Sequence, residues 1–143
     1  MNGEFTTAVH ALVYLANHPR LVSSEELARN VCTNPARIRK IMGKLRRAYL
    51  ITTKEGVNGG YLLLETQDKI NLCTILDAVG APAVKEGWHS GGGDLTCLIS
   101  TGMARVMDGI TADLNQLCRK RLAQITIQNL SDKILKNRNC EGA

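Results

Sequence analysis

Aromatic residues are scarce in this chain of 143 residues, which has one Trp, one Phe and three Tyr. Surfaces that bind unpaired bases place aromatic side chains between their basic residues as stacking platforms. The most basic stretch of this chain, described below, offers only Tyr49 and, in the hairpin that follows, Tyr61. The composition therefore disfavours a binding surface for single-stranded nucleic acid.

The chain also has little that is typical of membrane or secreted proteins. No uncharged apolar run approaches the roughly 20 residues that cross a bilayer, and Met1–Glu4 carries no basic region of the kind that opens a secretory signal. Its five cysteines are odd in number and far apart, which suits reduced thiols better than a disulfide framework. We expect a cytoplasmic protein that contacts no membrane.

Catalytic motifs are missing as well. There is no Walker loop, dinucleotide fingerprint, nucleophile elbow or HExxH run. The glycine run Gly91–Gly93 lacks the Lys and Ser or Thr of a phosphate loop, and His10 and His18 lie on or just after an amphipathic stretch, where packing or capping explains them. We expect no enzyme, no catalytic residues and no bound metal.

Acidic residues are absent between Glu26 and Glu55, although this segment is rich in Lys and Arg. A surface of one sign repels itself unless an anion neutralises it. The segment therefore predicts a polyanionic partner, with an ordinary solvated basic face as the alternative. The basic residues that we consider are Arg37, Arg39, Lys40, Lys44, Arg46, Arg47 and Lys54.

The same segment has the pattern of a helix-turn-helix. Ser23 and Glu26 have the spacing of a capping box, and a short amphipathic helix follows them. After a turn at residues 32–33, Asn34 is a good N-cap and Pro35 suits the first helical position. The second helix has its apolar residues at i, i+3, i+4 and i+7, namely Ile38, Ile41, Met42 and Leu45.

The opposite face of this second helix carries Ala36, Lys40, Gly43 and Arg47. It is small at its centre and cationic at its edges. Because a glycine inside a helix costs about 1 kcal/mol relative to alanine, an outward Gly43 suggests that a partner's backbone comes close there. A DNA phosphate chain fits this description.

A glycine-rich hairpin follows the two helices. Leu50–Thr53 and Tyr61–Leu64 are rich in β-branched and apolar residues, and Asn58, Gly59 and Gly60 between them tolerate positive φ. Beside a recognition helix such a hairpin is a wing, whose Lys54 and glycine N–H groups reach phosphates or a minor groove. A hairpin that merely caps the core is the alternative.

Three further segments complete the chain. Phe5–Asn17 predicts a first helix with Val9, Leu12, Val13 and Ala16 on its apolar face, and Leu72–Val79 predicts a short helix ended by Gly80. Gly87–Asp94 predicts a flexible loop. We expect a DNA-binding domain over residues 1–80, a glycine-rich sensor loop over 81–100, and a dimerisation helix with a tail over 101–143.

A long helix is predicted from Thr101 to about Gln124, with apolar residues that recur at four, three, four and three. Such a stripe needs a partner, and its own copy in a two-fold dimer is the simplest one. Packing against the chain's own winged domain is the alternative. The stripe consists of Met103, Met107, Ile110, Leu114 and Leu117.

These features in this order closely resemble the IscR/NsrR/CymR family of bacterial winged-helix transcriptional regulators, which act as homodimers. The resemblance covers nearly the whole chain. It rests on Leu27-Ala28, on a basic helix ending Lys44-Leu45-Arg46-Arg47, on Leu50-Ile51, on Gly56 to Gly60 with Tyr61-Leu62-Leu63, on Ile75 to Val79, and on the long helix with Ile125 to Leu130. Its most specific part is the wing motif Asn58-Gly59-Gly60-Tyr61.

The resemblance implies DNA contacts in two places. Arg39 departs from the acidic residue of the iron-sulfur member, so the operator is not inherited. The implied contacts are Asn34, Pro35, Ala36, Arg37, Arg39 and Lys40 in the recognition helix, and Asn58 and Gly59 in the wing. The charge pattern adds Lys44, Arg47 and Lys54.

The sensing loop departs further from the family. Iron-sulfur members bind their cluster through three cysteines before the long helix, whereas this loop offers Cys97, with His89 and Asp94 nearby. We therefore expect no cofactor; an unusual iron-sulfur or metal site completed by the partner protomer is the alternative. Oxidation of a Cys97 thiolate near His89 is the sensor hypothesis, against a buried and inert Cys97.

The sequence thus predicts a mainly α protein with a small β-hairpin wing: a winged helix-turn-helix domain plus a long dimerisation helix. We interpret it as a homodimeric regulator of transcription that binds double-stranded DNA, a repressor, and redox-responsive through Cys97. A winged-helix adaptor for protein partners is the alternative of a different class.

Overall fold

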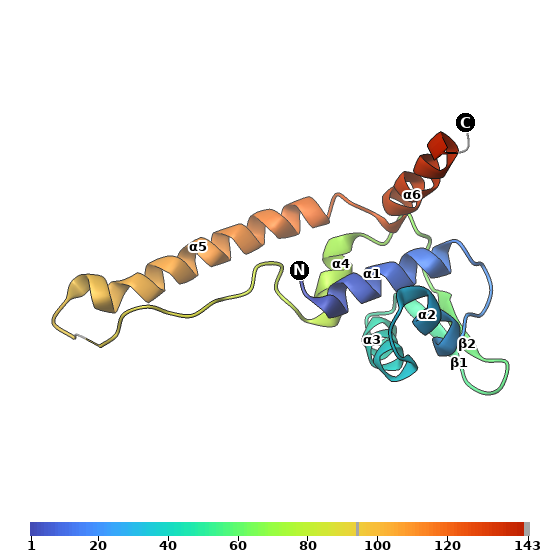
Figure 1. Ribbon diagram of the computed structural model, residues 1–143, viewed down its shortest axis with the longest axis horizontal. Helices are drawn as coiled ribbons and strands as arrows, with labels where there is room; N and C mark the ends of the chain where they lie inside the picture. Colours follow the sequence, from blue (N-terminus) through green and yellow to red (C-terminus); the bar gives the residue numbers. More distant parts are fainter. Residues whose placement is uncertain (94, 142–143) are drawn as a thin grey trace.

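A computed structural model describes residues 1–93 and 95–141. In this part the chain is mostly helical and has one two-stranded antiparallel sheet, so the predicted fold class is confirmed. The elements are α1 (Gly3–Ala16), α2 (Ser24–Val31), α3 (Pro35–Arg47), β1 (Ile51–Lys54), β2 (Gly60–Leu63), α4 (Leu72–Val79), α5 (Leu98–Leu122) and α6 (Ile127–Glu141). Helices α1–α4 and the hairpin form one body, from which α5 extends (Figure 1).

Side-chain caps fix where three of the helices begin. Ser23, Asn34 and Asn71 each accept a hydrogen bond from the backbone N–H three residues later, at 3.1, 2.8 and 2.9 Å. These bonds satisfy N–H groups that a helix leaves unpaired at its first turn. The beginnings predicted for α2, α3 and α4 are confirmed.

Helix α1 begins two residues before the predicted position because Asn2 caps it through the N–H of Phe5, at 2.8 Å. Its buried face also differs from the prediction. Leu12 is buried as expected, but Val9, Val13 and Ala16 are only partly covered. The fully buried side of α1 is the side on which α3 and α4 pack. Its apolar residues are Phe5, Ala8, Ala11, Leu12 and Leu15.

The core lies where α1, α3 and α4 meet. All four residues predicted for the apolar face of α3 are fully buried: Ile38, Ile41, Met42 and Leu45. They pack with the buried side chains of α1 and α4 in a single apolar cluster. The basic side chains of α3 therefore lie outside a well-filled core.

In the hairpin, Ile51 pairs with Leu63 and Lys54 pairs with Gly60. On its other edge, β2 forms an antiparallel bridge between Tyr61 and Val22. Of the three loop residues expected to supply positive φ, Gly60 adopts it and Asn58 and Gly59 do not; Gly56 is the other wing residue with positive φ. Glycine is required at position 59 for space, because a Cβ there would meet the Lys54 carbonyl oxygen at 2.0 Å. The wing is therefore narrow where Gly59 lies against the backbone of Lys54.

The long helix α5 begins at Leu98, three residues before the predicted start, and ends at Leu122. The described residues of the segment before α5, 81–93 and 95–97, contain no helix or strand, as expected, but they run back beside α5 (Figure 1). Hydrogen bonds attach them to α5 along its length. Both backbone groups of Val84 bind the Asn115 side chain at 2.8 Å, His89 binds Asp108 at 2.6 Å, and the Gly92 N–H binds the Ser100 hydroxyl at 3.1 Å. The prediction of a flexible glycine loop missed these attachments.

The sequence did not predict α6. Ile127, in its first turn, is fully buried, and Ser131 accepts a hydrogen bond from Asn17 at 3.0 Å. These contacts bind α6 to the end of α1. None of the helices in the described ranges is both long and apolar enough to span a bilayer.

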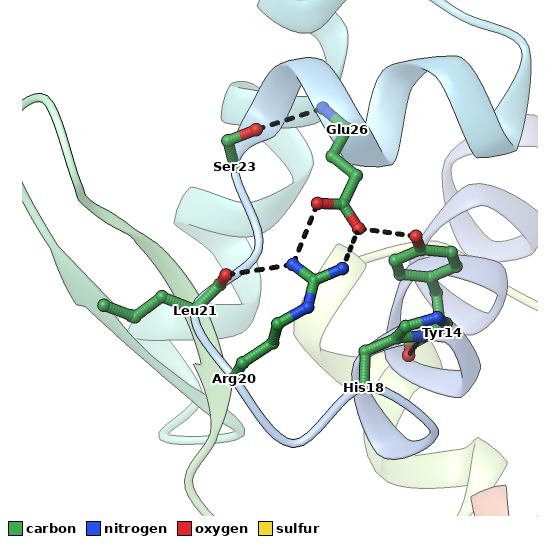
Figure 2. Close-up of polar contacts among 6 residues, drawn as sticks. All are labelled: Tyr14, His18, Arg20, Leu21, Ser23 and Glu26. Carbon is green, nitrogen blue, oxygen red and sulfur yellow. Dashed lines mark hydrogen bonds and ion pairs between the residues drawn. The ribbon is translucent and has the colours of Figure 1, made fainter.

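A polar cluster sets the position of α2, the first helix of the helix-turn-helix. The carboxylate of Glu26 accepts two hydrogen bonds from Arg20, at 2.9 and 2.8 Å, and one from the Tyr14 hydroxyl, at 2.5 Å (Figure 2). The ring of His18 stacks on Tyr14, which confirms a packing role for this histidine. Glu26 therefore joins α1, the following loop and α2, instead of closing the predicted capping box with Ser23.

This cluster makes folding stability depend on pH in a definite direction. Hydrogen bonds from Arg20 and then Tyr14 lower the pKa of Glu26 from 4.5 to about 2. Because the folded pKa is the lower one, the stabilisation is complete above pH 4.5 and is lost as the pH falls towards 2. Arg20 is half exposed, so solvent screens the pair.

We expect Glu26→Gln to lower the free energy of unfolding by about 1 kcal/mol at neutral pH. The gap from the wild type should narrow as the pH falls from 4.5 towards 2. Urea denaturation of both proteins across this range measures the gap, with the exposed Glu65→Gln as the control. A gap that stays constant would show that the Glu26 charge contributes no stability.

Candidate nucleic-acid interface

A groove separates α3 from the hairpin on the outer side of the helix-turn-helix. Its volume is about 450 Å³. Its walls combine side chains from the start of α2, from α3 and from the wing. They are Ser23, Ser24, Glu25, Arg39, Gly43, Arg46, Thr53, Lys54, Glu55, Gly56, Val57, Gly59, Gly60 and Tyr61.

The side of α3 that faces the wing carries Arg39 and Arg46. Arg39 donates a hydrogen bond to the Ser24 hydroxyl at 3.3 Å and lies 3.7 Å from a carboxylate oxygen of Glu25. These contacts hold the guanidinium of Arg39 at the groove in the free chain. Ser24, Glu25, Thr53 and Tyr61 were not among the predicted site residues, because only the three-dimensional packing of α2 and the hairpin beside α3 brings them to the groove.

The side of α3 that faces α1 carries Arg37 and Lys44. The Nζ atom of Lys44 lies 2.5 Å from Glu4 and donates to the Val79 carbonyl at 3.3 Å. Its side chain is only 24% exposed, whereas that of Lys40 is 69% exposed. Lys44, predicted as a DNA contact, is thus already bound within the protein.

The outward face of α3, between these two sides, carries Ala36, Lys40, Gly43 and Arg47, as the helical period predicts. A Cβ built on Gly43 would have Arg47 as its nearest neighbour, at 4.0 Å. No contact inside the described part of the chain therefore requires glycine at this position. The arrangement provides a small, open patch with two cations on it.

The start of α3 and the wing provide the remaining predicted residues. Asn34 accepts the Arg37 N–H at 2.8 Å and Pro35 occupies the first turn, so both serve the helix itself. Lys54 and Gly59 line the groove, and Asn58 is exposed beside them. Their geometry is open to a ligand, and their contact with DNA stays a prediction.

The predicted sensor residues are not brought together. Cys97 is half-buried and caps the start of α5 through its backbone. His89 is hydrogen-bonded to Asp108, which lies further along α5. Hydrogen bonding to Asp108 raises the pKa of His89. Asp94 lies outside the described residues. Among the residues that are described, no three His, Cys, Asp or Glu side chains are grouped so as to hold a metal ion.

The predicted seam of α5 is exposed. Its five apolar side chains are between 40% and 62% accessible, and the helix lies beyond the body of the molecule (Figure 1). They are Met103, Met107, Ile110, Leu114 and Leu117. The alternative in which this stripe packs against the chain's own winged domain is wrong.

Comparison with known proteins gives a family and a fold. The model of the Rrf2 family, described as an iron-dependent transcriptional regulator, matches residues 1–133. The fold resembles that of a protein from Lactobacillus plantarum that is named a putative transcriptional regulator. The identity is 24% over 100% of both chains, and the TM-score is 0.79. Comparison with curated proteins finds no match.

Two structures with more specific names are also similar. IscR from T. potens has 18% identity, over 94% of this chain and 87% of that one, with a TM-score of 0.70. CymR, the global cysteine regulator of B. subtilis, has 16% identity, over 93% and 96%, with a TM-score of 0.66. At these identities the likeness concerns the fold.

The family is described as iron-dependent, but the described part of this chain has no group of side chains that could hold an iron ion. Residues 81–100 contain one cysteine, Cys97, and iron-sulfur clusters are typically held by several thiolates. His89 is engaged by Asp108. The residues of this loop therefore do not fit such a cluster.

Proposed function

Because the chain belongs to the Rrf2 family of transcriptional regulators, we propose that it binds double-stranded DNA as a homodimer and represses transcription. The observation that carries this proposal is the outward face of α3, where a small open patch at Gly43 is flanked by Lys40 and Arg47 beside a groove bounded by the wing. A recognition helix of this kind enters the major groove, and the wing follows the backbone.

Basic side chains on different parts of this surface are expected to contact different parts of the DNA. Arg39 and Arg46 line the groove and have the chemistry to bind base edges or the phosphates next to them. Arg47 and Lys54 are exposed and have the chemistry of backbone contacts. The basic segment offers few aromatic side chains for stacking, which favours duplex DNA over single strands.

The homodimer is supported by the exposed seam of α5. A stripe of large apolar side chains from Met103 to Leu117 on this 25-residue helix is costly to leave in water, and a second copy covers it by symmetry. Two recognition helices then face two half-sites about 34 Å apart on one side of the duplex. A dimer bound at a promoter excludes polymerase sterically, which is why we propose repression.

Redox control through Cys97 stays a subsidiary proposal. The thiol is half-buried at the start of α5, next to the loop that is attached along this helix. Oxidation there would change how the loop packs on α5 and hence the spacing of the two DNA-binding domains. His89 has no role in this proposal, because its ring is hydrogen-bonded to Asp108.

The dependence of binding on salt tests the proposal against a protein-binding adaptor. We expect affinity for duplex DNA to fall roughly 10³-fold or more between 50 and 200 mM salt if about six phosphates are contacted. Duplexes selected from a random pool should share a palindromic motif, which reports DNA binding, the dimer and the half-site spacing together. Weak binding that salt does not change would favour the adaptor.

A further inference from the structure

Glu4 is the acidic residue that contacts the recognition helix from the side of α1. It lies in the first turn of α1, which Asn2 caps. One carboxylate oxygen is 2.5 Å from the Nζ of Lys44 and the other is 3.5 Å from the Nζ of Lys40. A single carboxylate therefore spans two lysines that are four residues apart on α3.

The two lysines differ in what else holds them. Lys44 has a second partner in the Val79 carbonyl at the end of α4, so its ammonium group is turned towards the protein. Lys40 has no further partner within the described residues and is largely exposed on the outward face. The hydrogen bond from Lys44, together with the charge of both lysines, lowers the pKa of Glu4, so this carboxylate is ionised at neutral pH.

We propose that Glu4 determines specificity by competing with DNA phosphates for Lys40 and by holding Lys44 away from them. The inference rests on DNA binding through α3. Non-specific affinity comes almost entirely from phosphate neutralisation, so a carboxylate that occupies two lysines weakens it directly. Arg39 and Arg46 lie on the other side of α3, at the groove, so the base contacts proposed for them keep their strength. Glu4 thus raises the ratio of specific to non-specific affinity.

Glu4→Gln tests the proposal in the full-length protein. We expect affinity for a random duplex to rise roughly 5- to 10-fold at 50 mM salt, and the slope of log affinity against log salt to steepen by about one or two units per dimer. Affinity for a duplex selected from the random pool should rise less, so the specificity ratio falls. Binding titrations of both duplexes from 50 to 200 mM salt measure these quantities.

The matched control is Glu65→Gln, which removes the same charge from an exposed residue that makes no ion pair in the described part of the chain. In a Lys40→Gln/Lys44→Gln background, Glu4→Gln should have no further effect on the slope. Equal slopes for Glu4→Gln and Glu65→Gln would overturn the proposal, as would an effect that persists without the two lysines. Thermal unfolding checks that each variant is folded.

A second measurement leaves Glu4 in place. Since Lys44 is already bound within the protein, Lys44→Gln should flatten the salt slope less than Arg47→Gln does. An equal or larger effect of Lys44→Gln would contradict the proposal. If the wild type binds duplexes with the expected salt dependence, these failures concern Glu4 alone; a wild type that ignores DNA would overturn both proposals.

Discussion

Ile110→Arg should convert the protein from a dimer into a monomer and lower its affinity for a two-site operator by roughly 10²-fold or more. Ile110 lies in the middle of the exposed seam of α5 and is 47% accessible in the single chain. In a symmetric dimer the two copies of the residue lie near the two-fold axis, so two arginines would meet in an apolar interface. Each monomer would then bind one half-site and would lack the added affinity that comes from binding both half-sites at once.

Sedimentation at micromolar protein concentration measures the oligomeric state, and titrations with one and two half-sites separate intrinsic affinity from avidity. Ala112→Arg is the control, because it adds the same charge on the opposite face of α5. It should remain dimeric, and Ile110→Arg should keep its affinity for a single half-site. A dimeric Ile110→Arg would show that the seam is not the interface.

The sequence predicted the helix-turn-helix well because its signals are local. Ser23, Asn34 and Pro35 act within one turn of the helices that they begin, and the buried face of α3 follows from the helical period alone. Both kinds of signal need only the residues nearby. The four–three spacing of the apolar stripe on α5 is likewise a property of one helix, and its role as a dimer interface stays a prediction.

What the sequence did not predict depends on contacts between distant segments. Glu4 and Lys44 are 40 residues apart, and Glu26 binds Arg20 and Tyr14 instead of completing a box with Ser23. The helical period places Lys44 at the edge of the cationic face but does not show which neighbour lies beside it. A list of basic residues therefore overestimates how many are available to DNA.

The basic side chains of α3 fall into groups with different surroundings. Arg39 and Arg46 face the groove, Lys44 is held by α1 and α4, and the outward centre is left to Lys40, Gly43 and Arg47. Charge alone would attract any polyanion to all of these cations. Shape matters most at Gly43, because it is the position where α3 exposes its backbone to an approaching ligand.

Gly43→Leu should weaken DNA binding by roughly 10²-fold, because displacing α3 from the major groove disrupts several contacts that are each worth about 1–3 kcal/mol. The substitution should not harm the fold. A Cβ at this position has its nearest neighbour at 4.0 Å, and leucine favours helix by up to about 1 kcal/mol over glycine. The free energy of unfolding should therefore rise while affinity falls.

These opposite signs separate a steric clash with DNA from a damaged protein. Gly43→Ala is the graded control: it should give a similar gain in stability and a smaller loss of affinity, because its side chain ends at Cβ. Urea denaturation and duplex titration on the same preparations measure both quantities. A Gly43→Leu protein that is more stable and binds DNA as tightly as the wild type would show that no nucleic acid approaches the outward face of α3, and this would remove the main support for recognition by this helix.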